Sequence, residues 1–193
     1  MAGAEYGLLI YDIPSDEPRL AARIPKAVRK HALRVNLSCY LFPWRDEAAV
    51  RAAIAEAEED LEEACEAYVI PQGETSVQDL LDLAQASAQK GVENLMRSMV
   101  SRASGMAEFI KEKIADGELA ADGAEEYELR RRRSILRNFL ERKAEIEAVC
   151  IALRISGRVK GVFAAAEKAA EAERECVKKL AEAAGARCRT ATA

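Results

Sequence analysis

The sequence predicts an α+β protein in which a small β-α-β-α-β module is followed by long antiparallel helices. Strand and helix patterns alternate over residues 5–74, and apolar residues recur at helical spacing over 75–186. Charged residues make up 32% of the chain and aromatic residues only 5%, a composition that favours long helices. A length of 193 residues fits one domain, or a small domain with a helical region. We therefore expect a module at 1–74, a helical hairpin or bundle at 75–186 and a disordered tail at 187–193.

The module begins with a predicted strand at 5–13, because a near-continuous apolar run is typical of a strand that is buried on both faces. Asp16 follows a turn and can cap a helix over 20–32, which Pro25 should kink. A second strand is expected at 33–44, where apolar and polar residues alternate as in a half-buried strand.

The rest of the module is a helix capped by Asp46 that continues to Ala64, followed by a short strand at 65–74. A right-handed crossover makes the first two strands parallel if they share a sheet. This order resembles a ferredoxin-like unit whose last strand is missing or supplied elsewhere. An unfinished sheet leaves an edge that can pair with another chain, so we expect a homodimer formed through the module.

The helical region begins with apolar residues that recur every three or four positions over 77–114, which predicts one long helix with weak points at Gly91 and Gly105. A second helix is expected over 124–155 and a third over 158–184, separated by a break at Ser156-Gly157. Helices joined in this way pack antiparallel.

Composition also limits the classes of function. A net charge of −4 argues against a surface that coats nucleic acid generally. No apolar run approaches the roughly 20 residues that span a bilayer, and the N-terminus lacks the features of a signal peptide. Five scattered cysteines and a single histidine do not predict a zinc site or a disulfide framework. We expect a cytoplasmic protein with reduced thiols and no membrane contact.

Charge is distributed unevenly within the module. Between Pro18 and Arg45 the chain holds six Lys or Arg residues and no acid, while 56–66 holds seven acids and no base. The basic residues are Arg19, Arg23, Lys26, Arg29, Lys30 and Arg34. The simplest interpretation is a surface on which a basic helix pairs with an acidic one. A nucleic-acid or anion-binding site on the first helix is the alternative.

A second basic cluster, "LRRRRSILRNFLERK", lies at residues 129–143. Its four consecutive arginines spread around more than one face of a helix, which is typical of a solvated helix. No aromatic stripe interleaves with either basic cluster, so the pattern does not indicate stacking of single-stranded bases.

Asp12 is the sharpest candidate for chemistry, because a carboxylate at the end of a strand can hold Mg²⁺. Two copies of Asp12 related by a dimer axis could share one ion, whereas a single Asp12 could cap the turn at Pro14-Ser15. No phosphate-binding loop, dinucleotide-binding, nucleophile-elbow or zinc-protease motif is found. The sequence therefore favours a protein without catalysis and without a cofactor.

The segment "LLIYDIPSDEPRLAARIPKAVRKHALRVNLSCYLFP", residues 8–43, resembles the start of two related ferredoxin-like groups. In the small CRISPR-adaptation protein the first strand also ends in Tyr-Asp-Ile, and that likeness implies a metal-binding role for Asp12 alone. In the N-terminal domain of chromate-resistance regulators the second strand ends in Leu-x-Pro, like Leu41-Phe42-Pro43 here. In the regulators an acidic helix, a third strand and long charged helices then follow. This chain has the same order, so its layout is closer to the regulators.

The expected function is therefore that of a dimeric, non-enzymatic regulatory or interaction protein. One alternative is a Mg²⁺-dependent nuclease-like protein that uses Asp12 from two protomers. Another is a structural protein whose long helices, over 76–186, bind a protein partner.

Overall fold

The chain forms two compact units. The first, here called the sheet unit, comprises residues 1–91 and 144–161, and the second, the helical unit, comprises 92–143 and 162–193. The computed structural model describes residues 5–12, 20–59, 66–72 and 77–190. The predicted turn and cap at 14–16 and the predicted boundary at residue 74 lie outside the described residues.

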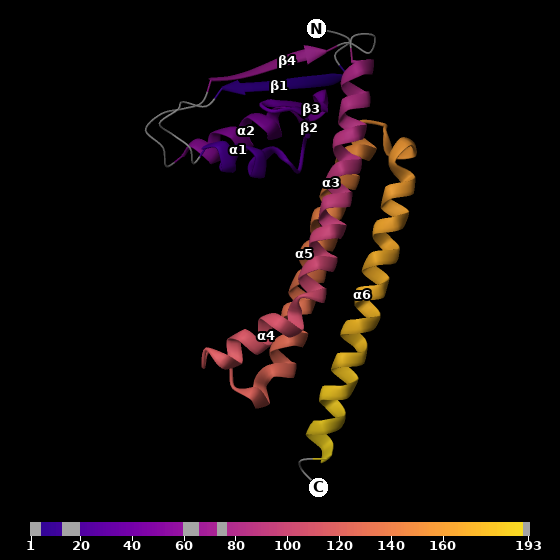
Figure 1. The fold of residues 1–193 in the computed structure, drawn as a ribbon. Coiled ribbons are helices and arrows are strands. Elements are labelled where there is room, and N and C mark those ends of the chain that lie inside the picture. Colours follow the sequence, from indigo (N-terminus) through magenta and orange to yellow (C-terminus); the bar gives the residue numbers. More distant parts are fainter. Residues whose placement is uncertain (1–4, 13–19, 60–65, 73–76, 191–193) are drawn as a thin grey trace. The chain divides into compact units, whose positions relative to one another are not determined.

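The sheet unit is built on four antiparallel strands in the order β2-β3-β1-β4 (Figure 1). The strands are β1 (Tyr6–Asp12), β2 (Leu33–Asn36), β3 (Cys39–Pro43) and β4 (Glu66–Gln72). β1 is central and pairs with β3 on one side and with β4 on the other. Helices α1 (Leu20–Val28) and α2 (Glu47–Glu58) lie together on one face of this sheet (Figure 1). The predicted α+β class is confirmed.

The prediction of a single second strand at 33–44 is wrong, because this segment folds as a hairpin of β2 and β3. The Asn36 side-chain oxygen accepts a hydrogen bond from the backbone N–H of Leu37 at 2.8 Å, and the Leu37 side chain is largely exposed in the turn. Arg34 donates from Nε to the carbonyl oxygens of Asn36 and Leu37 at 3.1 and 3.0 Å. The sheet therefore has four strands among the described residues, not three. β1 and β2 run in the same direction, with β3 inserted between them.

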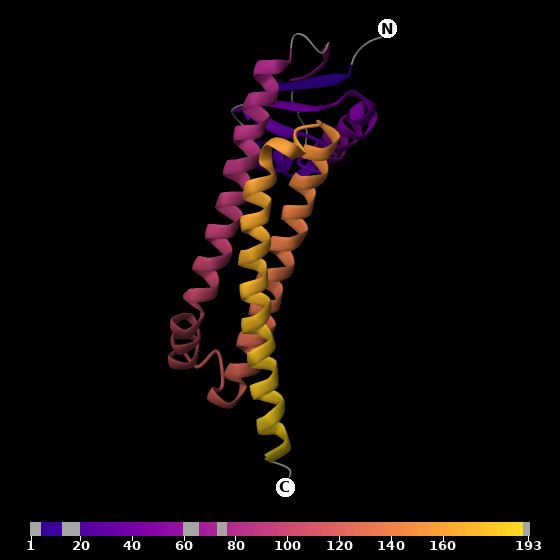
Figure 2. The ribbon, with the colours of Figure 1, turned by 90° about the vertical axis from the view of Figure 1, so that its right-hand side faces the viewer.

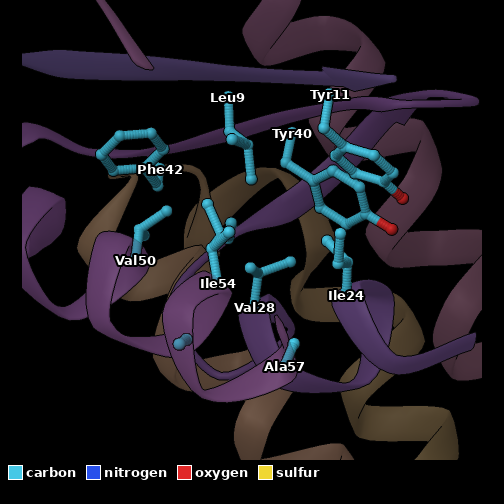
Figure 3. Close-up of a cluster of buried hydrophobic side chains, with 11 residues drawn as sticks. Leu9, Tyr11, Ile24, Val28, Tyr40, Phe42, Val50, Ile54 and Ala57 are labelled. Atoms are coloured by element: carbon cyan, nitrogen blue, oxygen red, sulfur yellow. The ribbon is translucent and has the colours of Figure 1, made fainter. Parts of the chain in front are cut away.

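The core of the sheet unit lies between the sheet and the two helices (Figure 3). Strand residues that point toward the helices meet helix residues recurring at helical spacing. The main members are Leu9, Tyr11, Tyr40 and Phe42 from the sheet and Ile24, Val28, Val50, Ile54 and Ala57 from the helices. Gly7 lies opposite Phe42 in the register, and a Cβ atom at Gly7 would come within 2.2 Å of the Phe42 ring. This close approach requires glycine.

Four further helices follow: α3 (Gln78–Ser104), α4 (Met106–Ala115), α5 (Ala124–Ala152) and α6 (Ser156–Thr190). Short 3-10 helices occupy Trp44–Asp46 and Ala121–Gly123. The break between α3 and α4 falls at Gly105, one of the two predicted weak points. Asp46 precedes α2 as predicted, but its side chain makes no capping hydrogen bond. None of the described helices is long and apolar enough to cross a membrane.

The ends of α4 and α5 share one geometry. Gly117 after α4 has φ +70°, and the next N–H, of Glu118, donates back to the carbonyl of Lys113 at 2.9 Å. Arg154 after α5 has φ +61°, and the N–H of Ile155 donates to the carbonyl of Cys150 at 2.9 Å. Both are Schellman ends. Glycine adopts this left-handed conformation without strain, whereas an arginine in the same place is strained. The predicted break at Ser156-Gly157 therefore lies slightly too late, because an arginine makes the reversal.

The helical unit consists of parts of α3, α5 and α6 with α4. Figure 2 shows α5 and α6 running side by side. The two helices run antiparallel. Arg132 of α5 pairs with Glu173 of α6, whereas Lys143, which is later in α5, pairs with Glu167, which is earlier in α6. The buried residues are mostly apolar, and the largest of them are Met99, Met106, Ile110, Leu136, Phe139 and Phe163.

Candidate functional site

Asp12 is the last residue of β1 and is exposed. Its partner across the strand pair is Glu66 at the start of β4, so the sheet brings two acidic positions to one end. Within the part of the chain that the structure describes, no group of three or more His, Cys, Asp or Glu side chains could hold a metal ion. Binding of Mg²⁺ by Asp12 stays a prediction.

Several basic residues of the module line one groove, which is formed by α1, the turn that follows it and α2. The groove has a volume of about 770 Å³ and is lined by residues of both helices. Its basic wall consists of Arg23, Lys26, Arg29, Lys30 and His31. Four alanines of α2 also line it, Ala49, Ala52, Ala53 and Ala57, and we call them the alanine floor; Glu56 and Glu59 complete the lining. We call this site the α1–α2 groove.

Two arginines of the groove are already engaged within the sheet unit. Arg23 donates from Nη1 to the carbonyl oxygen of Ala57 at 3.4 Å, which links α1 to the end of α2. The Nε atom of Arg29 lies 3.0 Å from Oε2 of Glu145 on α5. This nitrogen is buried and makes no aligned hydrogen bond, so the contact is an ion pair alone. Lys26 and Lys30 have exposed side chains and form the outer part of the basic wall.

The predicted set of six basic residues is therefore divided. Arg23, Lys26, Arg29 and Lys30 line the groove, whereas Arg34 stabilises the β2–β3 turn and Arg19 lies outside the described residues. His31 also lines the groove, although it did not belong to the predicted basic set. The alanine floor was also missed, although alanine at three- and four-residue spacing on one side of α2 is visible in the sequence.

The hydroxyls of Tyr11 and Tyr40 lie at one end of the core, where the two rings stack with centroids 5.9 Å apart (Figure 3). Burial raises the pKa of Tyr40, and Tyr11 raises it further. Burial therefore favours the neutral hydroxyl of Tyr40 over its phenolate.

The arginine run of α5 contains one residue that is not solvated. Arg132 has a side chain that is only 13% exposed, and its guanidinium contacts three elements. It donates to Oε1 of Glu128 at 2.7 Å, to both carboxylate oxygens of Glu173 on α6 at 2.9 and 3.2 Å, and to the carbonyl of Ala103 on α3 at 2.9 Å. We call this group the Arg132 cluster. The prediction of a fully solvated arginine run is wrong at this position. Leu129, Arg132 and Leu136 follow the inward spacing of α5, and this pattern could have identified it.

Comparison with known proteins does not assign a family. No protein-family model matches this chain, and no curated protein or solved structure is detectably similar to it. The function is therefore inferred from the chain itself.

Proposed function

We propose that this chain is a regulatory or interaction protein without catalysis of its own, and that the α1–α2 groove binds an acidic segment of a partner protein. The observation that carries this proposal is the combination of an alanine floor with a basic wall in an open groove of about 770 Å³. Alanine side chains let the backbone of a bound segment come close, and a helix laid in a groove is a common mode of peptide recognition.

The charges that line the groove favour a bound segment with acidic residues near the lysines and basic residues near the glutamates. Lys26 lies on α1 and Lys30 in the turn that follows it, and both side chains are exposed, so their ammonium groups can contact acidic residues of a bound segment. Glu56 and Glu59, which also line the groove, favour basic residues elsewhere on that segment. Complementary charges of this kind orient a partner and speed its association more than they add raw affinity.

The fold and the assembly state belong to the same proposal. The strand order β2-β3-β1-β4, with α1 and α2 on one face, is compatible with a ferredoxin-like module. A regulatory role would agree with the resemblance of residues 8–43 to chromate-resistance regulators. β4 is an edge strand, and Tyr68 and Ile70 on it are exposed, which supports pairing of two copies through this edge. Light scattering of the full chain should then report a dimer.

The proposed function is tested with a synthetic peptide on the full chain. The probe is a fluorescein-labelled amphipathic helix of about 20 residues, with glutamate on one side and alanine on the other, and the matched peptide carries lysine instead of glutamate. We expect the acidic peptide to bind more tightly, and the Lys26→Glu/Lys30→Glu variant to lose about tenfold or more in affinity. Lys90→Glu, on an exposed position of α3 outside the groove, is the control and should bind like the wild type.

A second variant separates docking in the groove from general attraction between charges. Ala52→Phe leaves every charge in place but fills the floor of the groove, because Ala52 lies on its lining. We expect this variant to weaken binding while its helix content stays unchanged by circular dichroism. If both peptides bind alike, or if Lys26→Glu/Lys30→Glu and Ala52→Phe both bind like the wild type, the proposed role of the groove is wrong.

A further inference from the structure

A stacked aromatic pair lies at the surface of the helical unit, between α4 and α5. The ring centroids of Phe109 from α4 and Tyr127 from α5 are 6.4 Å apart, and the ring planes differ by 22°. Both side chains are only partly buried. The sequence did not predict an aromatic group beside the arginine run, because Phe109 comes from a different helix and is brought there by the reversal between α4 and α5.

Three cations lie over these two rings. The Nζ atom of Lys113 is 5.6 Å from the centroid of Phe109, and Arg130 is 5.7 Å from that of Tyr127. Arg131 lies over both rings, at 5.8 and 5.9 Å. Lys113 is also paired with Glu118, whereas the two guanidinium groups are held beside the rings by cation–π attraction. A guanidinium held in this way keeps its N–H donors available and offers a planar surface for stacking.

The same surface continues into a groove along α5. Arg130, Arg133 and Arg137 line it with Leu129 and Ser134, and its volume is about 510 Å³. The steps of three and four residues place the three arginines on one side of the helix. They extend over about 10 Å of the helix axis, at 1.5 Å per residue. Glu126 lines the groove as well and is the only carboxylate among its described lining residues.

We infer that this surface binds single-stranded nucleic acid. Successive phosphates of one strand would lie along Arg130, Arg133 and Arg137, since arginine pairs with phosphate through two N–H groups at once. Unpaired bases would stack beside Tyr127 and Phe109 and on the guanidinium planes, which is how proteins bind single strands without reading their sequence. A duplex keeps its base faces inside the stack and could use only the arginines. An acidic protein segment would also leave the aromatic pair unused.

This inference is independent of the proposed function, because the α1–α2 groove belongs to the sheet unit and this surface belongs to the helical unit. Binding of an acidic peptide and binding of a nucleic acid can therefore fail separately. Variants in the α1–α2 groove should leave nucleic-acid binding unchanged, and variants of the α5 arginines should leave peptide binding unchanged.

The test measures fluorescence anisotropy of labelled oligonucleotides about 16 nucleotides long with the full chain. The probes are oligo(U), oligo(dT), a DNA duplex of equal length and heparin. We expect the two single strands to bind more tightly than the duplex, with oligo(U) against oligo(dT) reporting a preference for RNA or DNA. The Arg130→Ala/Arg133→Ala/Arg137→Ala variant should lose most of this affinity. Its slope of log affinity against log salt should fall by about 2, because three phosphate contacts are removed.

The aromatic pair is tested separately from the charges. Tyr127→Ala should weaken binding of single strands by about tenfold, whereas Tyr127→Phe, which keeps the ring, should bind like the wild type. The control for the arginines is Arg97→Ala/Arg102→Ala/Lys111→Ala, three exposed positions of α3 and α4 outside the groove. Thermal melting followed by circular dichroism verifies that every variant is folded.

Three results would overturn the inference. The wild type could fail to bind either single strand at low salt. The control variant could lose as much affinity as the groove variant, so that the effect would reflect charge in general. Heparin and the duplex could bind as tightly as the single strands, with no loss in Tyr127→Ala, which would mark the surface as a general polyanion site.

Discussion

Removal of Arg132 should destabilise the helical unit more than removal of any exposed arginine. Arg132 joins α3, α5 and α6 through Ala103, Glu128 and Glu173, so its loss affects three helices at once. We consider Arg132→Met, which keeps a long apolar stem of similar size and deletes the guanidinium.

The expected loss of stability comes from the Glu173 carboxylate, which loses its partner. The Glu173 side chain is 11% exposed and receives two of the guanidinium's hydrogen bonds, so in Arg132→Met it becomes a buried charge without this partner. Removing one partner of a buried ion pair costs about 3–5 kcal/mol. In a chain of this length, 1 kcal/mol corresponds to about 2–4 °C in the melting temperature, so the expected decrease is about 10 °C.

The assay is urea unfolding followed with two probes. Far-UV circular dichroism reports on the helices, and the single tryptophan, Trp44, reports on the sheet unit. Coincident transitions for the two probes would show that the units unfold together, which is required before a free energy is extracted. Arg174→Met is the matched control on α6, because Arg174 also contacts two glutamates but has a side chain that is 39% exposed. Exposed pairs of this kind contribute less than about 1 kcal/mol.

The double variant Arg132→Met/Glu173→Met tests whether the unpaired Glu173 carboxylate causes the loss of stability. Replacing a buried ion pair with apolar residues is often neutral or stabilising, so the double variant should recover most of the stability lost in Arg132→Met. The argument from an unpaired buried carboxylate would be refuted if Arg132→Met cost no more than Arg174→Met. It would fail equally if the losses of the two single variants simply added in the double variant.

Three further changes test the backbone and the thiols. Arg154→Gly should stabilise the chain by about 1 kcal/mol, because Arg154 has φ +61° and glycine adopts this conformation without strain. Gly117→Ala, at φ +70°, should destabilise the chain by a similar amount. The two variants should therefore shift the midpoint of urea unfolding in opposite directions. Gly7→Ala should lower the melting temperature, since the added Cβ would overlap the Phe42 ring, and an unchanged temperature would contradict the packing. Burial raises the pKa of Cys150 to about 12, so its thiolate is scarce in the folded chain. Iodoacetamide at pH 8 should therefore modify Cys150 only after urea is added, and mass spectrometry would detect the modification.

Patterns close together in the chain were predicted best from the sequence. The alternation of strands and helices before residue 74 and the helical spacing after it predicted the α+β class, and Gly105 was recognised as a weak point in a helix. The β2–β3 hairpin was missed because Leu37 continues the alternation of a single strand, although it lies in the turn. The end of α5 was placed too late because glycine is the usual signal for a left-handed residue, and here that residue is Arg154.

By itself, the sequence determined the class of the fold and the concentration of positive charge on the first helix and on α5, because periodicity and charge runs are properties of neighbouring residues. Only the tertiary structure decided which charges act together. It placed Lys26 and Lys30 beside an alanine floor from α2, and it brought Phe109 to Tyr127 and Arg131. It also buried Arg132 against Glu173, which is distant in the chain. The physical reason is that burial and charge pairing depend on distances across helices, and these distances are set by packing rather than by position in the chain.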